Sequence, residues 1–315
     1  MTKVFITGAT GFIGKVVLRE ILKQLGPEDR VYILVRKPFT SEDRRVVTVL
    51  GDLAQLEKVD GFVRNADFII HIAGEARLRG GCDYNTANVM SMQLLLDSAK
   101  KNNSLRRFIF ISSIAAVDRS PSDFCNTPIT VDSLCFPRTE YGTSKRMAEE
   151  ALLESNVPYT IFRPGCVYGP GMRDDSHLRT FARYMRKGLP LHWFGLPGKM
   201  SLIHVDDLAS AIVKCLTSES GYNRTYLAET EYLPLGNALS LLGNSLFGRH
   251  SPQLYIPPMK FIFQRWHSRL PVIVAGIFLD YFWMDDPNFR NELIDANRQK
   301  LLRNNVQDII RDLLA

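Results

Sequence analysis

The sequence predicts an α/β fold in which a doubly wound parallel sheet is followed by a smaller, mostly helical region. Apolar strand-like runs alternate with helix-like segments over the first half of the 315 residues, which is the pattern of repeated βαβ units. Three regularly spaced glycines directly follow the first run. In the second half, loops rich in Gly and Pro separate shorter segments, so a different architecture is expected there.

The elements expected in the first half share one feature, since each strand-like run is almost continuously apolar. That is typical of parallel strands covered by helices on both faces. The expected strands are Val4–Thr7, Val31–Val35, Phe68–Ile72, Phe108–Ser112 and Tyr159–Phe162, and the expected helices are Gly14–Leu25, Asn88–Asn102 and Tyr141–Ser155.

The pattern changes after residue 165, although part of the later chain returns to the sheet. A strand is expected at Leu202–Val205, a helix at Asp206–Leu216 capped by Asp206 or Asp207, and a further strand at Thr225–Ala228. An apolar core or lid helix over Leu270–Trp283 and an amphipathic helix over Glu292–Leu314 complete the prediction. We assign 1–165 with about 202–230 to the sheet domain, and about 166–201 with 231–315 to a substrate-binding region.

Composition and charge narrow the classes of partner. The net charge is +6, but the basic residues are scattered as pairs without a basic–aromatic stripe, so no nucleic-acid partner is expected. No metal site is expected either, because the six histidines show no ligand spacing. The five cysteines show neither CxxC nor metal-ligand spacing, so a reducing, cytoplasmic location without disulfides is expected for Cys82, Cys125, Cys135, Cys166 and Cys215.

No signal peptide or transmembrane segment is expected. A strand begins within the first few residues, and the most apolar later stretch, Leu270 to Trp283, is interrupted by Pro271 and Asp280. That stretch falls short of the roughly 20 residues that a membrane helix needs. Whether it contacts a membrane or a substrate is left open.

The glycine spacing after the first strand predicts a dinucleotide site of the Rossmann type. Small residues let the backbone approach a pyrophosphate, and the helix that follows supplies amide donors and a favourable dipole. The cofactor-binding residues expected in this turn are Gly8, Thr10, Gly11, Phe12, Ile13 and Gly14.

The end of the second strand favours NADP(H), with NAD(H) as the possible alternative. An NAD site usually has a carboxylate there, whereas this strand is followed by Arg36 and Lys37. Glu28 and Asp29 lie before the strand, at its wrong end. A guanidinium and an ammonium suit the 2′-phosphate of NADPH.

Tyr141 and Lys145 form a candidate proton-transfer pair. They are the only YxxxK in the chain, and residues four apart share a helix face. A nearby ammonium lowers the pKa of a tyrosine and prepares its phenol to exchange a proton with a substrate oxygen. The same lysine could reach the nicotinamide ribose. Ser112 or Ser113, at the end of the fourth strand, would hydrogen-bond the substrate carbonyl, and the residues alone leave that choice open.

With these motifs the chain resembles the extended short-chain dehydrogenase/reductase family, the NAD-dependent epimerase/dehydratase superfamily, over essentially its full length. The resemblance implies that Ser113, Tyr141 and Lys145 are the catalytic triad and that the protein is a homodimer formed through a helical bundle. It also implies further cofactor-binding residues. The matching segments are Thr7–Gly14, Gly51–Leu53, His71–Gly74, Ser112-Ser113, Tyr141–Lys145, Arg163–Gly165 and His204–Ala209, and the implied cofactor residues are Asp52, Leu53, Ala73, Gly74 and Pro164.

Within this family the chain looks most similar to the dihydroflavonol reductase and 3β-hydroxysteroid dehydrogenase-like branch, as judged from Val35-Arg36. Sugar-nucleotide epimerases usually have an arginine just before the strand that ends in His-Val-Asp-Asp. Here Met200 stands near that position, with Lys199 as a possible substitute. Aromatic residues in the second half favour an apolar substrate, namely Trp193, Phe194, Tyr255, Phe261, Phe263, Trp266, Phe278, Tyr281, Phe282 and Trp283.

The sequence thus predicts an NAD(P)-dependent oxidoreductase that reduces a carbonyl, or oxidises a secondary alcohol, on a small hydrophobic substrate. Tyr141 would serve as the general acid or base. A nucleotide-sugar epimerase or dehydratase with tightly bound NAD is the first alternative. A non-catalytic dinucleotide sensor is the second, and proteins of that kind often lack the Tyr/Lys pair that this chain retains.

Overall fold

A computed structural model describes residues 1–53, 58–76, 83–120, 123, 125–248, 250, 253–255 and 269–314. The chain forms two compact units. The first unit comprises residues 1–116, 139–163 and 209–226, and the second comprises 117–138, 164–208 and 227–315. Residues 117–138 therefore pack with the second unit, although the sequence prediction grouped them with the sheet domain.

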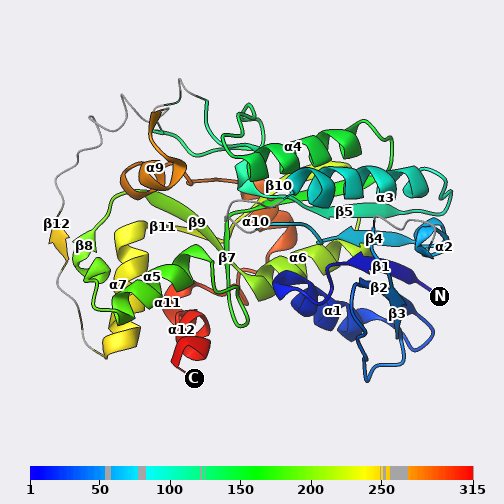
Figure 1. Cartoon of the computed structure of the whole chain (residues 1–315), viewed down its shortest axis with the longest axis horizontal. Coiled ribbons are helices and arrows are strands. Elements are labelled where there is room, and N and C mark those ends of the chain that lie inside the picture. The colour runs from blue at the N-terminus through cyan, green and yellow to red at the C-terminus, as the bar shows by residue number, and fades with distance from the viewer. Residues whose placement is uncertain are drawn as a thin grey trace. The chain divides into compact units, whose positions relative to one another are not determined.

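A seven-stranded parallel sheet of the Rossmann type organises the first unit and confirms the predicted fold class (Figure 1). The strand order is β10-β6-β5-β4-β1-β2-β3, and it reverses direction between β1 and β4. Ligands of open α/β sheets bind beyond the carboxyl ends of the strands at such a switch point. The strands are β1 (Lys3–Thr7), β2 (Arg30–Val35), β3 (Val46–Leu50), β4 (Phe68–His71), β5 (Arg107–Ile111), β6 (Tyr159–Pro164) and β10 (Arg224–Ala228).

Helices cover both faces of this sheet, with α3 and α4 side by side on one face and α1 on the other (Figure 1). On the α3–α4 face, Phe5, Ile69 and Phe108 of the sheet pack with Leu95 of α3 and Leu152 of α4. Burial on both faces explains why the strands are almost continuously apolar. The helical segments are α1 (Phe12–Gln24), α2 (Asp60–Arg64), the π-helical turn η2 (Asn85–Met90), α3 (Ser91–Ala99), the 3₁₀ turn η3 (Ile114–Ala116), α4 (Glu140–Leu153) and α6 (Val205–Thr217).

The second unit is built around a three-stranded sheet of order β11-β9-β7. Its central strand β9 runs antiparallel to β11 and parallel to β7. Short helices and a two-stranded pair, β8 with β12, surround this sheet. The elements are β7 (Cys166–Tyr168), α5 (His177–Arg186), η4 (Leu191–Trp193), β8 (Phe194–Gly195), β9 (Lys199–His204), β11 (Glu231–Pro234), α7 (Leu235–Phe247), β12 (Leu254–Tyr255), α9 (Val272–Phe278), α10 (Pro287–Leu293), α11 (Leu302–Asn305) and α12 (Gln307–Leu314).

A buried arginine explains why residues 117–138 belong to the second unit. The Arg119 guanidinium is almost fully buried and donates hydrogen bonds to the carbonyl oxygens of Thr127, Asp280 and Tyr281, at 3.0, 2.8 and 2.9 Å. Buried carbonyls need such donors, so the arginine joins two segments about 160 residues apart. A second link is the carboxylate of Asp118, which accepts the hydroxyl of Tyr281.

Two of the predicted helices are wrong in extent. Glu292–Leu314 is not one helix but the end of α10 followed by α11 and α12, because the intervening backbone bonds to other segments. The amides of Lys300 and Leu302 donate to the carboxylates of Asp207 and Glu231, and these bonds compete with helical ones. In the apolar stretch from Leu270, the helix covers only α9 and ends where residues 279–284 run beside β9.

Within the described residues, no helix is both long enough and apolar enough to cross a membrane. No disulfide joins Cys125, Cys135, Cys166 or Cys215, of which Cys125 and Cys215 are buried. Cys82 lies outside the described residues, as do Phe261, Phe263 and Trp266 of the predicted aromatic set.

Candidate functional site

The glycine turn after β1 is as tight as the sequence pattern predicts. Gly8 has a φ of +76°, and a Cβ atom there would lie 2.6 Å from the amide nitrogen of Ala73. A Cβ atom at Gly14 would lie 2.0 Å from the carbonyl oxygen of Gly8. Glycine is therefore required at both positions for α1 to approach the turn.

The end of α1 nearest this turn is suited to an anion. Thr10 and Gly11 lead into the helix, and Phe12 and Ile13 are its first two residues. Among the described residues, no side chain caps this end of α1. Its first amides can then bind a phosphate, with the helix dipole adding to the attraction.

The carboxyl end of β4 forms a second wall of the site, held by the Thr7 hydroxyl. Thr7 Oγ1 lies 2.7 Å from Nδ1 of His71 and accepts the amide of Ala73 at 3.3 Å. At Gly74, a Cβ atom would lie 2.6 Å from Oδ1 of Asn88 and 3.3 Å from Nζ of Lys145. Ala73 and Gly74 thus lie against the glycine turn and close to Lys145.

The buried His71 side chain makes this wall sensitive to acid. Burial, and to a smaller degree the charge of Lys145, lowers the pKa of His71 to about 3. His71 becomes protonated near pH 6.5 in the unfolded chain but stays neutral at that pH in the folded chain. The contribution of His71 to the free energy of unfolding is therefore fully present above pH 6.5 and is lost as the pH falls toward 3. Between pH 7 and pH 5 the free energy of unfolding should fall by about 2 kcal/mol more for the wild type than for His71→Gln. Urea titrations at both pH values measure this difference, and equal losses in the two proteins would contradict it.

Helix α4 places Tyr141 and Lys145 at the carboxyl end of β5. Thr139 Oγ1 caps the helix by accepting the amide of Gly142 at 3.0 Å. A Cβ atom at Gly142 would lie 2.2 Å from the carbonyl oxygen of Ala115, so glycine lets α4 pack directly on η3. The segment that follows Ser113 is thereby held against the first turn of α4, which contains Tyr141.

Lys145 is buried, and its surroundings are unusual for an ammonium group. Its Nζ donates to the carbonyl oxygen of Ile111 at 3.0 Å and lies 4.9 Å from the centre of the Phe110 ring. Burial lowers the pKa of Lys145 to about 8. An ammonium held at this depth is a strong source of positive potential for a neighbouring phenol.

The two candidate serines differ in their hydrogen bonds. Ser113 Oγ is half-buried and accepts the amide of Ala115 at 3.2 Å. Ser112 Oγ is buried and has no partner among the described residues. Both follow β5 directly, next to the carbonyl of Ile111 that holds Lys145, so the choice between them stays open to experiment.

Asn88 is a site residue that the sequence analysis missed. It lies in the π-helical turn η2, and its Oδ1 accepts the amide of Glu75 at 2.8 Å. Its Nδ2 donates to Ser144 Oγ on α4 at 2.9 Å. Asn88 thus connects the loop after Gly74 to α4, which contains Tyr141 and Lys145. Only its burial distinguishes it from an ordinary helical asparagine, and helical periodicity does not reveal that.

The candidate adenosine end of the site lies where β2 and β3 end together. Val35 is opposite Leu50, and the amide of Gly51 donates to the carbonyl of Val35 at 3.0 Å. Arg36 and Lys37 are exposed, and no carboxylate of the described residues pairs with either of them. Asp52 and Leu53 follow the carboxyl end of β3, at the same edge of the sheet as Arg36.

One predicted cofactor residue lies outside the first unit. Pro164 is the last residue of β6 and is buried, but it belongs to the second unit. Arg163 before it forms a bidentate ion pair with the buried Glu149 of α4, at 2.9 and 2.8 Å. This pair connects β6 to the helix that contains Lys145.

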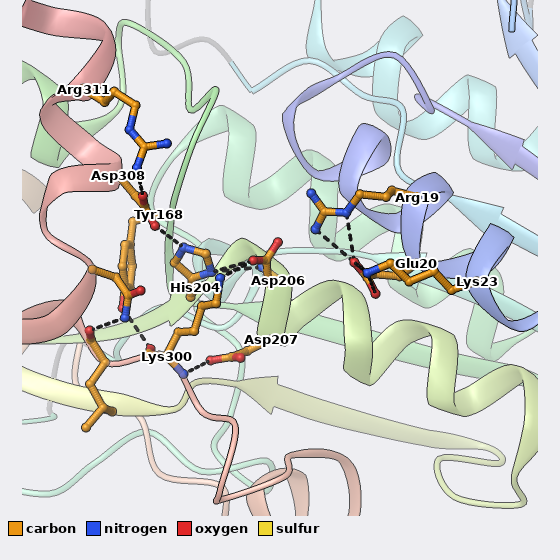
Figure 2. A network of polar contacts seen from close by, with 12 residues as sticks. Arg19, Glu20, Lys23, Tyr168, His204, Asp206, Asp207, Lys300, Asp308 and Arg311 are labelled. Atoms are coloured by element: carbon orange, nitrogen blue, oxygen red, sulfur yellow. Dashed lines mark hydrogen bonds and ion pairs between the residues drawn. The ribbon is translucent and has the colours of Figure 1, made fainter. Parts of the chain in front are cut away.

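The side chains of the His204-Val205-Asp206-Asp207 motif make hydrogen bonds within the fold. The predicted cap of the helix by Asp206 or Asp207 is wrong. Helix α6 already begins at Val205, and His204 Nδ1 accepts the amide of Asp206 at 3.2 Å. Figure 2 shows His204 between Asp206 and Asp308, with Nε2 3.1 Å from the Asp308 carboxylate. Asp206 and Asp207 instead bind Lys300, and burial raises the pKa of Asp207 to about 6.

The ammonium group of Lys199 already has an aromatic and an acidic partner within the second unit. Its Nζ lies 3.7 Å from the centre of the Trp283 ring and 3.7 Å from a carboxylate oxygen of Asp280. Met200 beside it is buried and pairs with Phe282. In the part of the chain that the structure describes, no group of three or more His, Cys, Asp or Glu residues could hold a metal ion.

Comparisons with known proteins agree with this geometry. The chain is 33% identical to a ceramide reductase of Caulobacter vibrioides over 214 residues, which covers 67% of this chain and 59% of that protein. It is 27% identical to a UDP-glucose 4-epimerase of Vibrio cholerae over 235 residues, covering 71% of this chain and 69% of the relative.

A solved UDP-glucuronic acid 4-epimerase of Bacillus cereus, in complex with NAD, shares the fold with a TM-score of 0.76 and 19% identity, and each chain is covered completely. The model of the NAD dependent epimerase/dehydratase family matches residues 4–227 of this chain. The chain belongs to the NAD dependent epimerase/dehydratase family.

Proposed function

We propose that this protein is an NADPH-dependent reductase that converts a carbonyl group of a hydrophobic substrate to a secondary alcohol, or catalyses the reverse oxidation. The observation that carries the proposal is the buried ammonium of Lys145 on α4. It lies one helical turn from Tyr141 and beside the serines that follow β5. Such a group favours the ionised form of a nearby phenol and so adjusts it for proton transfer.

Each residue then has a distinct task. The dinucleotide supplies or accepts the hydride when bound. Tyr141 donates its proton to the substrate oxygen during reduction, and Lys145 lowers the pKa of that phenol and binds the ribose. Ser113, or Ser112 with its buried hydroxyl, orients the substrate oxygen by a hydrogen bond. The glycine turn and the first amides of α1 fit the pyrophosphate.

The preference for NADPH over NADH rests on Arg36 and tests the cofactor proposal. Because its guanidinium is exposed at the end of β2, Arg36→Ala should raise the Kd of NADPH about 10- to 100-fold and change that of NADH less than about twofold. Fluorescence titration with both nucleotides measures this, with Arg44→Ala, at an exposed arginine before β3 and away from the end of β2, as the matched control. Equal weakening of both nucleotides, or tighter binding of NADH by the wild type, would refute the NADPH preference.

The proposed substrate class is supported by the ceramide reductase and by Lys199. The match with that enzyme spans 59% of its length, so its activity is a guide to the class of substrate only. Lys199 would have to serve as the phosphate-binding cation of an epimerase, yet it stacks on Trp283 and pairs with Asp280. Hydrophobic ketones, including keto forms of ceramides, are therefore the first compounds to test for NADPH oxidation.

The similarity to the UDP-glucose 4-epimerase of Vibrio cholerae supports the epimerase alternative. An epimerase regenerates its cofactor in each cycle and retains it. Acid denaturation of the purified protein should then release about one NAD per chain, whereas the proposed reductase should release little. A retained NAD together with binding of UDP would replace the proposed reductase by an epimerase.

We also propose that the protein forms a homodimer through α3 and α4. The two helices pack together in the first unit. Exposed apolar residues are Met147 and Leu153 of α4 and Met90, which directly precedes α3. A second copy would remove these side chains from water. The cytoplasmic location stays a prediction from the cysteine pattern.

A further inference from the structure

Positive charge is concentrated in two segments of the chain. Residues 176–205 and 232–279 contain nine Lys and Arg residues and no Asp or Glu, while the rest of the chain has more acidic than basic residues. The net charge of +6 therefore comes from these segments alone. Such segregation is unusual for a protein surface, on which both signs are normally mixed.

The fold of the second unit brings described parts of both segments together. Strand β12 pairs with β8, with Leu254 opposite Phe194, and the His192 ring lies 5.1 Å from that of Phe247. The turn after α5 is closed by the amide of Leu189, which donates to the carbonyl of Tyr184 at 3.1 Å. Figure 1 shows α5, α7, β8 and β12 grouped in one region of this unit.

Large apolar side chains are exposed in this region, and we call them the apolar patch. Each of the five has between 39% and 54% of its surface exposed. The patch consists of Tyr184, Leu189, Trp193, Phe247 and Leu254. Arg186 and Lys187, at the end of α5, are exposed between the first two of these residues in sequence. The elements that carry these side chains contact one another, and exposed apolar groups on neighbouring elements of a soluble protein usually mark a site of contact.

We propose that the apolar patch, with Arg186 and Lys187, docks the protein on the surface of an anionic lipid bilayer. Aromatic and aliphatic side chains enter the boundary between headgroups and acyl chains, and neighbouring cations attract anionic lipids. A tryptophan with exposed ring surface is the side chain best suited to that boundary. The proposal does not depend on the reductase function.

The charge of the region argues against a second copy as its occupant. A two-fold interface would place Arg186 and Lys187 opposite the same cations, and the two segments themselves supply no acidic partner. The carboxylate of Asp174, just before α5, pairs with Arg179 and Arg183 instead. Nucleic acid would account for the cations but not for exposed Leu189 and Leu254. An anionic bilayer complements both the charge and the apolar surface.

Sedimentation of the purified full chain with phosphatidylcholine vesicles, with and without phosphatidylglycerol, tests this proposal. The wild type should partition onto vesicles that contain phosphatidylglycerol, and the partition coefficient should fall with added salt. Because each cation near the surface changes binding about fivefold, Arg186→Glu with Lys187→Glu should lower it at least tenfold. Trp193→Ser should lower it about tenfold.

The matched controls are Lys100→Glu with Lys101→Glu, an exposed basic pair at the end of α3, and Leu134→Ser, whose side chain is 75% exposed. Both should stay within about twofold of the wild type, and thermal unfolding should verify that every variant is folded. Absence of vesicle binding, or equal losses in the controls, would overturn the proposal. So would tighter binding to duplex DNA than to vesicles, or a dimer in gel filtration that the patch substitutions dissociate.

Discussion

Replacing Tyr141 by Phe should lower kcat for the reduction of a ketone about 10²- to 10⁴-fold, because the phenol is the proposed proton donor. The Kd of NADPH should change by less than about threefold, since the variant keeps the ring and its packing against Tyr84 at 5.9 Å. Single-turnover oxidation of NADPH separates the chemical step from binding. The loss should appear in that step.

Tyr84→Phe is the sharpest control for this prediction, because its ring lies next to that of Tyr141. It should retain most of the activity. If Tyr84→Phe lost activity while Tyr141→Phe retained it, the proton donor would be Tyr84 and the proposed roles would be wrong. If neither substitution changed the activity, a reduction that depends on either of these two phenols would be excluded.

Local pattern accounts for the parts of the fold that were predicted well. The buried strands β1, β4 and β5 are almost continuously apolar. The glycines Gly8 and Gly14 after β1 are required because a Cβ atom there would lie 2.6 and 2.0 Å from backbone atoms. Such features are set by neighbouring residues in sequence and by the two covered faces of the sheet. They can therefore be recognised in a single chain.

The missed elements fall into two groups. Strand β3 has a clear β-branched pattern at Val46–Leu50 and was overlooked, although the signal was present. The interruption of Glu292–Leu314 had no local signal. Helical periodicity continues there, but the carboxylates of Asp207 and Glu231 bind the backbone from distant positions. Tertiary hydrogen bonds of this kind cannot be read from spacing.

The site shows the same division between local and distant causes. Tyr141 and Lys145 were found because their spacing is helical, and Arg36 because it directly follows a strand. Asn88 was missed because its function depends on partners 13 and 56 residues away, namely Glu75 and Ser144. The cap of α6 was misassigned because His204 accepts a hydrogen bond with its ring nitrogen, a less common cap than a carboxylate.

Replacing Lys145 by Met should abolish most activity and yet make the protein more stable. Burial lowers the pKa of Lys145 from 10.5 to about 8, so at pH 7 the buried ammonium costs about 3 kcal/mol of folding free energy. The lost hydrogen bond to the carbonyl of Ile111 offsets about 1 kcal/mol of that gain. The free energy of unfolding should rise by about 2 kcal/mol, while kcat falls at least about 100-fold.

The pH dependence of this difference identifies its cause. Because the folded-state pKa is lowered, the unfolded chain holds the proton more tightly between pH 8 and 10.5, and wild-type stability gains over that window as the pH rises. The advantage of Lys145→Met at pH 7 should therefore nearly vanish by about pH 9.5. Lys100→Met, at an exposed position, should change stability by less than about 0.5 kcal/mol at either pH. A destabilised Lys145→Met protein, or an advantage that is constant with pH, would mean that burial does not lower the pKa of Lys145. An advantage that grows by more than about 2 kcal/mol as the pH falls from 8 to 6 would mean that the buried amine is already neutral at pH 7, and that the ammonium proposed to adjust Tyr141 is absent.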